Sequence, residues 1–133
     1  MLSQEEIYRR VSAALVESLN VDEEEITPGA RLQGDLGAES IDFLDIVFRL
    51  ERAFGIQIPR GELFPESIFQ GNPEFVQNGR VTNRGIVELR QRLPFADLGD
   101  FEKDPELSRI GDLFTVQLIA RYIESKLGHG SGR

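Results

Sequence analysis

Residues 40–54, SIDFLDIVFRLERAF, predict one helix with apolar side chains on two opposite faces. At about 100° per residue, one face gathers Phe43, Ile46, Val47, Leu50 and Phe54, and the other gathers Ile41, Leu44 and Phe48. A small helical bundle buries both faces of a helix only when that helix is central. The second stripe is therefore either further core, covered by the chain between residues 60 and 105, or an exposed surface.

The charges around the second stripe favour an exposed surface. Asp45 borders the stripe, Asp42 and Glu51 flank it more widely, and Arg52 lies on it. An exposed apolar patch rimmed by acids is typical of a docking surface for a basic partner.

Helical periodicity and turn residues predict the elements on either side. Residues 3–19 form a first helix, whose start carries the Ser-x-x-Glu capping box of Ser3 and Glu6. Turn-forming residues make residues 20–39 a long and mostly irregular loop, and Gly55 ends the helix of residues 40–54.

Two further helices are expected in the second half of the chain. Residues 82–93 form one, ended by Pro94, with Ile86, Val87 and Leu89 on its buried side. The last helix covers about residues 112–127 and carries apolar residues at helical spacing, which are Leu113, Val116, Ile119, Ala120 and Ile123. The predicted fold class is all-α.

Composition excludes several kinds of site and partner. The 133 residues include no cysteine and one histidine, which leaves no disulfide, no thiolate metal site and almost no material for a histidine-based triad. A formal net charge of −8 repels nucleic acid and anionic membrane surfaces. We expect one domain over residues 1–133, monomeric and cytoplasmic, without stable membrane insertion, a metal site or catalytic residues.

Ser40 stands where a glycine-rich approach, GDLGAE over residues 34–39, enters the predicted helix. By position alone Ser40 is interpreted as an ordinary N-cap. The same stretch resembles the attachment motif of the acyl carrier proteins, which commonly reads Asp-Leu-Gly-Ala-Asp-Ser-Leu-Asp. Glu39 and Ile41 are chemically mild departures from that motif. The resemblance continues through ERAFGIQIP at residues 51–59 and returns at DLFTV, residues 112–116, and at Tyr122.

This resemblance implies an acyl-carrier-like four-helix bundle in which Ser40 bears 4′-phosphopantetheine taken from coenzyme A. An acyl or hydroxyacyl group would be carried on that arm as a thioester. The chain itself would perform no chemistry, and would be a substrate of a phosphopantetheinyl transferase and of acyltransferases. A helix N-terminus favours a phosphodiester, whereas the neighbouring acids oppose it, so we assign those acids to partner attraction.

Under the resemblance the side chains divide by face. The docking set, which would meet basic patches on acyl-chain synthesising enzymes and acyltransferases, comprises Asp35, Glu39, Ile41, Asp42, Leu44, Asp45, Phe48 and Glu51. The acyl-pocket set comprises Phe43, Ile46, Val47, Leu50 and Phe54, assisted by Ile7, Val11, Val116 and Ile119. Arg49 and Arg52 depart from the more acidic helix of the family and argue against ordinary docking by general fatty acid synthesis enzymes.

Residues from about 62 to 106 form a helical insertion before the closing helices, and residues 128–133 form a flexible tail. Within residues 79–93 one acid, Glu88, accompanies four arginines, Arg80, Arg84, Arg90 and Arg92. These arginines either pair with the protein's own acids or form a second docking surface. The phenylalanines of the insertion either extend the core or enclose an acyl cavity; they are Phe64, Phe69, Phe75, Phe95 and Phe101.

The insertion is similar to that of elongated acyl carriers that supply unusual or very long acyl chains to lipid A. The resemblance therefore implies a specialised carrier for fatty acid and lipid A (lipopolysaccharide) biosynthesis. The alternative is a non-carrier, acidic helical interaction module that binds a basic protein, with Ser40 as a cap. A hydrolase using Ser40 would lack both the Gly-x-Ser-x-Gly elbow and a nearby histidine.

Overall fold

The computed structural model describes residues 2–59, 61–64, 68, 70–93 and 98–127, and of Ser40 it describes the backbone. The predicted tail at residues 128–133, Phe69, Phe95 and Pro94 lie outside the described residues. The described elements, in chain order, are α1 (Gln4–Leu19), η1 (Glu23–Glu25), α2 (Ser40–Phe54), β1 (Val76–Gln77), β2 (Arg80–Val81), α4 (Asn83–Arg92), α5 (Gly99–Lys103), η2 (Leu107–Leu113) and α6 (Val116–Lys126). Apart from one small hairpin, this confirms the all-α, acyl-carrier-like fold.

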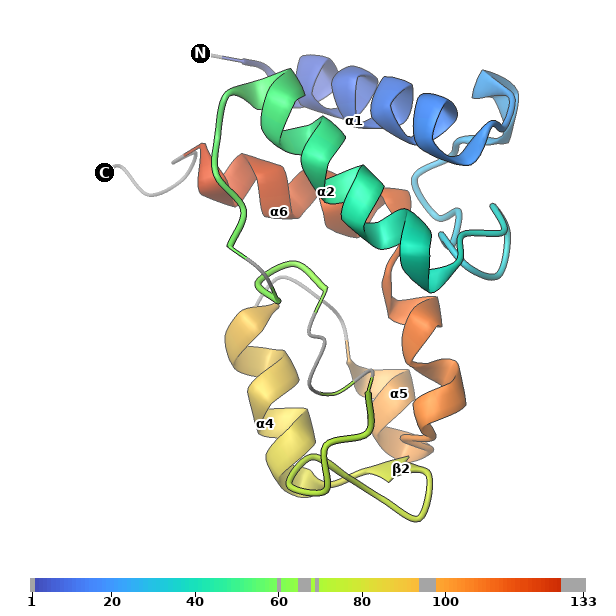
Figure 1. The fold of residues 1–133 in the computed structure, drawn as a ribbon, viewed down its shortest axis with the longest axis vertical. Coiled ribbons are helices and arrows are strands. Elements are labelled where there is room, and N and C mark those ends of the chain that lie inside the picture. The colour runs from blue at the N-terminus through green and yellow to red at the C-terminus, as the bar shows by residue number, and fades with distance from the viewer. Residues whose placement is uncertain (1, 60, 65–67, 69, 94–97, 128–133) are drawn as a thin grey trace.

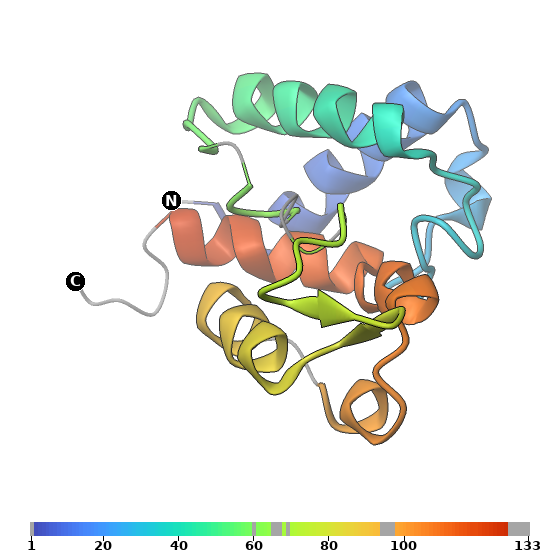
Figure 2. The ribbon, with the colours of Figure 1, turned by 60° about the horizontal axis from the view of Figure 1, so that its bottom comes forward.

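The long helices α1, α2 and α6 pack together on one side of the molecule (Figure 1). Helix α1 contacts both of the others, and Figure 2 shows it crossing between α2 and α6. Their shared core is fully buried and includes Ile7, Val11, Leu15, Ile46, Leu50, Ile119 and Ile123. Hydrophobic burial of these stripes is the main source of the bundle's stability.

The ends of α1 and α2 follow from local sequence. The Ser3 hydroxyl accepts a hydrogen bond from the Glu6 N–H at 3.1 Å, as the predicted cap requires. The Glu6 carboxylate, however, accepts from Arg9 and Arg10, and no described bond closes the box. Helix α2 ends at Gly55, whose φ of 65° is the left-handed conformation that glycine adopts easily.

Elements between α2 and η2 lie below the bundle in Figure 1. Strands β1 and β2 form an antiparallel hairpin around Asn78 and Gly79, whose φ values of 55° and 75° fit a type I′ turn. The Val81 N–H donates to the Pro105 carbonyl at 2.7 Å, which ties β2 to the chain before η2. Sequence analysis did not predict this hairpin.

Helix α4 matches the predicted helix, but the predicted burial of one side chain is wrong. Thr82 caps it by accepting from the Gly85 N–H at 3.2 Å, and Ile86 and Leu89 are buried. Val87, which was expected to be buried, is 51% exposed. Its direction is about 100° around the helix from Ile86, away from the face that Leu89 shares.

The last helix begins later than residue 112. Residues Leu107–Leu113 form a 3-10 helix, and α6 starts after Thr115, whose hydroxyl accepts from the Leu118 N–H at 3.1 Å. The intervening Phe114 is fully buried, and its carbonyl accepts from the Leu32 N–H at 2.9 Å. This bond to the loop before α2 engages the Phe114 carbonyl, so it competes with a continuous helix through residue 114. Of the apolar residues at helical spacing, Val116, Ile119 and Ile123 are buried, and Leu113 and Ala120 are partly buried.

None of the described helices combines the length and the apolar character that crossing a membrane would need.

Candidate functional site

The start of α2 does not use Ser40 as its cap. Glu39 occupies the N-cap position with an extended backbone, φ −110° and ψ 167°, and Ser40 is the first helical residue. The Glu39 N–H donates to the Asp42 carboxylate at 2.8 Å, which satisfies a backbone donor at the helix entrance. The interpretation of Ser40 as an ordinary N-cap is therefore wrong; its side chain lies outside the described part of the chain.

The loop of residues 31–39, which leads into Ser40, is anchored by buried side chains and by a backbone hydrogen bond. Leu36 and Ala38 are buried, and the Ala38 N–H donates to the Leu32 carbonyl at 2.8 Å. Between them Gly37 adopts a φ of 74°, which turns the chain toward α2. The packing of Leu36 and Ala38 therefore fixes the chain that leads directly into the backbone of residues 39 and 40.

Arg31 fixes the other end of this loop. The Asp35 carboxylate accepts from the Arg31 backbone N–H at 2.8 Å and from its guanidinium at 3.2 Å. The hydrogen bonds from Arg31 hold the pKa of Asp35 below its usual range. Asp35 is therefore ionised at neutral pH, but part of its charge is compensated within the loop.

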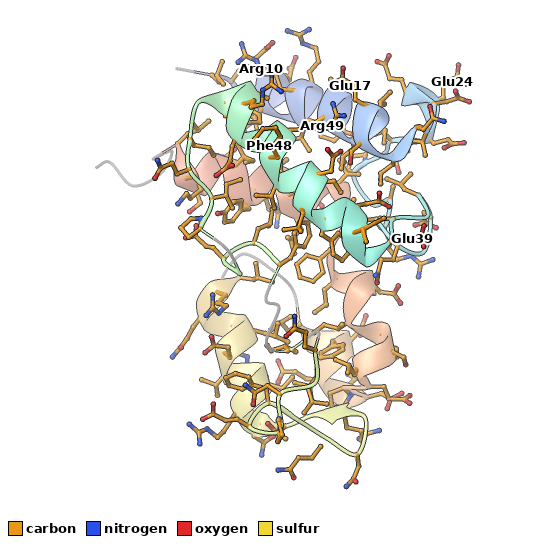
Figure 3. All side chains as sticks on the ribbon, viewed as in Figure 1. Arg10, Glu17, Glu24, Glu39, Phe48 and Arg49 are labelled. Carbon is orange, nitrogen blue, oxygen red and sulfur yellow. The ribbon has the colours of Figure 1, made fainter. Side chains whose placement is uncertain are left out.

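The second stripe of α2 is exposed. Ile41 is 75% exposed, Leu44 is 62% exposed and Phe48 is 55% exposed. Figure 3 shows Phe48 on α2, well along the helix from Glu39 at its start. The interpretation that both stripes are core is wrong, because these three side chains are exposed and the described residues after position 60 leave this face uncovered.

The acids around the stripe differ in their surroundings. Glu39 is exposed, whereas the Glu51 carboxylate accepts the Ile58 N–H at 2.8 Å. Asp45 accepts from the Arg49 guanidinium at 2.8 Å, and that bond lowers the pKa of Asp45. These carboxylates remain partly accessible, as docking would require. The docking role of the set defined from the sequence stays a prediction.

The opposite stripe faces the core. Phe43, Ile46 and Leu50 are buried, and Val47 and Phe54 are partly buried against the same cluster. The Phe43 ring stacks on Phe64 with centroids 4.4 Å apart, and Phe64 lies 5.2 Å from Phe114. Core membership of this stripe is confirmed, and its lining of an acyl pocket stays a prediction. Phe64 and Phe101 are buried and Phe75 is partly buried, which supports core extension by the described phenylalanines of residues 62–106.

The arginines of residues 79–93 are paired. The ion pairs are Arg80 with Asp104 at 3.1 Å, Arg84 with Glu74 at 2.8 Å, Arg92 with Glu88 at 2.5 Å, and Arg90 with Glu102. This confirms that the protein's own acids compensate these cations.

Sequence reasoning missed Glu62 and Ile56. Glu62 binds two side chains of α6, and Ile56 lines a surface groove at the end of α2. Glu62 stands in no recognisable motif, and Ile56 lies in the ERAFGIQIP stretch, which signals the family resemblance but not a groove. Within the described ranges, no group of three or more His, Asp or Glu side chains is arranged to hold a metal ion.

The sequence of this chain is similar to those of known proteins. Residues 9–67 match the PP-binding family, described as a phosphopantetheine attachment site. An acyl carrier protein of Thermotoga maritima is 41% identical over 63 residues, which cover 47% of this chain and 78% of that protein. An acyl carrier protein of Rubrobacter xylanophilus is 39% identical over 61 residues, which cover 46% of this chain and 75% of that protein.

Proposed function

The chain belongs to the acyl carrier protein family, and on that premise we propose that Ser40 is the residue that bears its covalently attached 4′-phosphopantetheine. Ser40 lies inside the matched residues 9–67 and begins α2. The observation that carries the proposal is the cap. Because Glu39 takes the N-cap position, the helix does not need the Ser40 hydroxyl for its own start.

The surroundings of residue 40 fit such a group. Glu39 and Ile41, its two neighbours, are exposed, so an enzyme can approach this end of α2. The positive end of the helix dipole favours the phosphodiester, while Glu39 and Asp42 weaken that attraction. The modification stays covalent, so it does not depend on tight phosphate binding by the chain.

The chain acts as a substrate rather than as a catalyst. In the loading step the Ser40 oxygen forms a bond to the phosphopantetheine phosphorus of coenzyme A, and the pyrophosphate P–O bond to that phosphorus breaks. Adenosine 3′,5′-bisphosphate leaves with the electron pair of that bond, and the hydroxyl proton passes to the transferase. When bound, the arm supplies the thiol that this cysteine-free chain lacks, and an acyl group is carried on it as a thioester.

The two faces of α2 then have separate roles. The exposed stripe, Ile41, Leu44 and Phe48, with the acids beside it, docks partner enzymes in the cytoplasm. Long-range attraction between such acids and basic partners speeds encounter without requiring a tight complex. The buried stripe lines the space that receives the acyl chain, and the carrier acts as a monomer of one domain with an insertion at about residues 62–106.

Intact-mass measurement tests the attachment. The purified chain is incubated with coenzyme A and a promiscuous phosphopantetheinyl transferase, and the mass is expected to rise by one phosphopantetheine group. Ser40→Ala is expected to abolish the rise, and Ser3→Ala, which removes the cap serine of α1, is expected to keep it. An unchanged wild-type mass, or modification of Ser40→Ala, contradicts the proposal and favours the non-carrier interaction module.

We further infer that the cargo is an acyl or hydroxyacyl group destined for lipid A. The support is the likeness of residues 62–106 to elongated carriers, together with relatives that match only about half of this chain. Deleting the gene in its source organism and analysing lipid A by mass spectrometry tests the assignment. Loss of one class of acyl chain is expected, and an unchanged lipid A contradicts it.

A further inference from the structure

The end of α2 carries a cation that has no acidic partner among the described residues. Arg52 is exposed, and its guanidinium lies over the Phe48 ring, 5.5 Å from the centroid. Such a cation–π contact orients the guanidinium without neutralising it. Arg49 differs, because it forms ion pairs with Asp45 and with Glu17 on α1.

A groove of about 510 Å³ lies beside Arg52. Its walls come from the last turns of α2 and from the extended chain after Gly55; they are Phe48, Glu51, Arg52, Ile56, Gln57, Ile58 and Pro59. The Glu51 carboxylate in this wall accepts the Ile58 N–H, so it is turned to the protein's own backbone. Arg52 is therefore the charged side chain of this groove that has no hydrogen bond or ion pair with a described residue.

The groove continues the exposed stripe of α2. Leu44, Phe48 and Arg52 follow each other at spacings of four residues, so they lie along one side of the helix. At the other end of the same helix is Glu39, which is exposed and forms no ion pair with any described cation. The docking face therefore has a negative start and a positive end, separated by about 20 Å of helix.

We propose that the groove beside Arg52 binds a partner-protein segment that places an apolar side chain against Phe48 and Ile56 and a carboxylate against Arg52. The proposal rests on the carrier function, and it names the chemistry of the partner. A matching enzyme presents a base toward Glu39 and an acid toward Arg52. An enzyme whose docking surface is basic throughout meets repulsion at Arg52, so this arginine selects partners by disfavouring the wrong ones.

A charge-reversal experiment tests this selection. The loading rate of the apo chain is measured with a promiscuous phosphopantetheinyl transferase chosen for a basic carrier-binding surface. Arg52→Glu is expected to raise kcat/KM about three- to fivefold at low salt, the range of an exposed charge pair, and Arg52→Ala less. The gain is expected to vanish in molar salt, because screening then acts within a few ångströms. The matched control is Arg121→Glu, the same charge change at an exposed arginine of α6, which is expected to leave kcat/KM unchanged.

A second arm tests recognition of the carboxylate. The transferase base nearest Arg52, located by cross-linking, is changed to Glu, and the preference is expected to reverse so that the wild-type chain loads faster than Arg52→Glu. Arg52 also interacts favourably with the negative end of the helix dipole at the end of α2, so its replacement can lower stability. The melting temperature of each variant is therefore recorded. A purely structural arginine would change melting without reversing the preference.

The outcomes separate the two proposals. If the wild-type chain loads at Ser40 but Arg52→Glu and Arg121→Glu behave alike, or the altered transferase shows no reversal, the groove assignment is overturned and the carrier function stands. If the wild-type chain does not load at all, the carrier function fails and the groove assignment falls with it.

Discussion

The Tyr122 hydroxyl donates a hydrogen bond of 2.5 Å to the Glu62 carboxylate, which joins α6 to the chain that follows α2. Lys126, one turn further along α6, lies 3.0 Å from the same carboxylate. Burial and the neighbouring Glu62 charge raise the pKa of Tyr122 far above its ordinary value, so the phenol stays protonated and remains a donor. Two α6 side chains therefore hold the point where the chain leaves the bundle.

Tyr122→Phe is expected to lower the free energy of unfolding by about 1–2 kcal/mol, because it removes a hydrogen bond to a charged group in a half-buried place. Urea unfolding followed by circular dichroism measures it. Tyr8→Phe is the control, since the Tyr8 hydroxyl reaches the Ile26 carbonyl only at 3.4 Å and its loss is expected to cost less than about 0.5 kcal/mol. Equal losses in the two variants would contradict a stabilising role for the Glu62 contact.

Glu62 predicts a specific loss of stability in acid. Burial alone would raise the pKa of Glu62, but hydrogen bonds from Tyr122 and Lys126 outweigh it and bring the pKa below its ordinary 4.5. Because the folded pKa is lower than the unfolded one, the contribution is complete above about pH 4.5 and is lost as the pH falls through the folded pKa.

The variant Glu62→Gln isolates this contribution. The difference in unfolding free energy between wild type and Glu62→Gln is expected to be constant from pH 7 to about pH 5 and to shrink below it. Urea titrations at each pH measure the difference. In the Tyr122→Phe background one cause of the lowered Glu62 pKa is gone, so the acid-dependent part of the effect of Glu62→Gln on unfolding free energy is expected to be smaller. A difference between wild type and Glu62→Gln that grows on acidification would contradict the sign argued for Glu62.

Local signals in the sequence were sufficient for the longest helices. The cap at Ser3 and the stop at Gly55 lie beside clear apolar stripes, so α1 and α2 were predicted within a residue of their ends. Asn78 and Gly79 were an equally local hairpin signal that was not used. The Glu62–Tyr122 contact spans sixty residues and leaves no periodic trace in the sequence.

The candidate site was predictable in its residues but not in its arrangement. The two stripes of α2 were evident, yet which of them is covered depends on where the chain after residue 60 packs. The cap at Glu39 had a readable signal, because Glu39 and Asp42 have the same spacing as Ser3 and Glu6. The groove beside Arg52 requires the path of residues 56–59, which no pattern specified.

The aromatic contact under α2 predicts a large difference between two phenylalanines. Phe64 is buried between Phe43 and Phe114, so Phe64→Ala is expected to cost about 3–5 kcal/mol through lost contacts and a cavity. Phe64→Leu, which keeps most of the volume, is expected to cost under about 1.5 kcal/mol. The exposed Phe48 is the matched control, and Phe48→Ala is expected to change stability by about 0.5 kcal/mol. Chemical denaturation of the variants checks the order, and a Phe64→Ala variant as stable as Phe48→Ala would contradict the packing.

The turn of the hairpin gives a prediction that depends on backbone conformation alone. Gly79 has open space around a built Cβ but a φ of +75°, so Gly79→Ala is expected to cost about 1–2 kcal/mol by forcing alanine into the left-handed region. Gly29 also has open space, without a positive φ, so Gly29→Ala is expected to be neutral or to stabilise by up to about 1 kcal/mol through a less flexible unfolded chain. Thermal unfolding compares the pair. Because neither new methyl group meets a neighbouring atom, equal losses of stability in the two variants would contradict the assignment of the cost to the φ of Gly79.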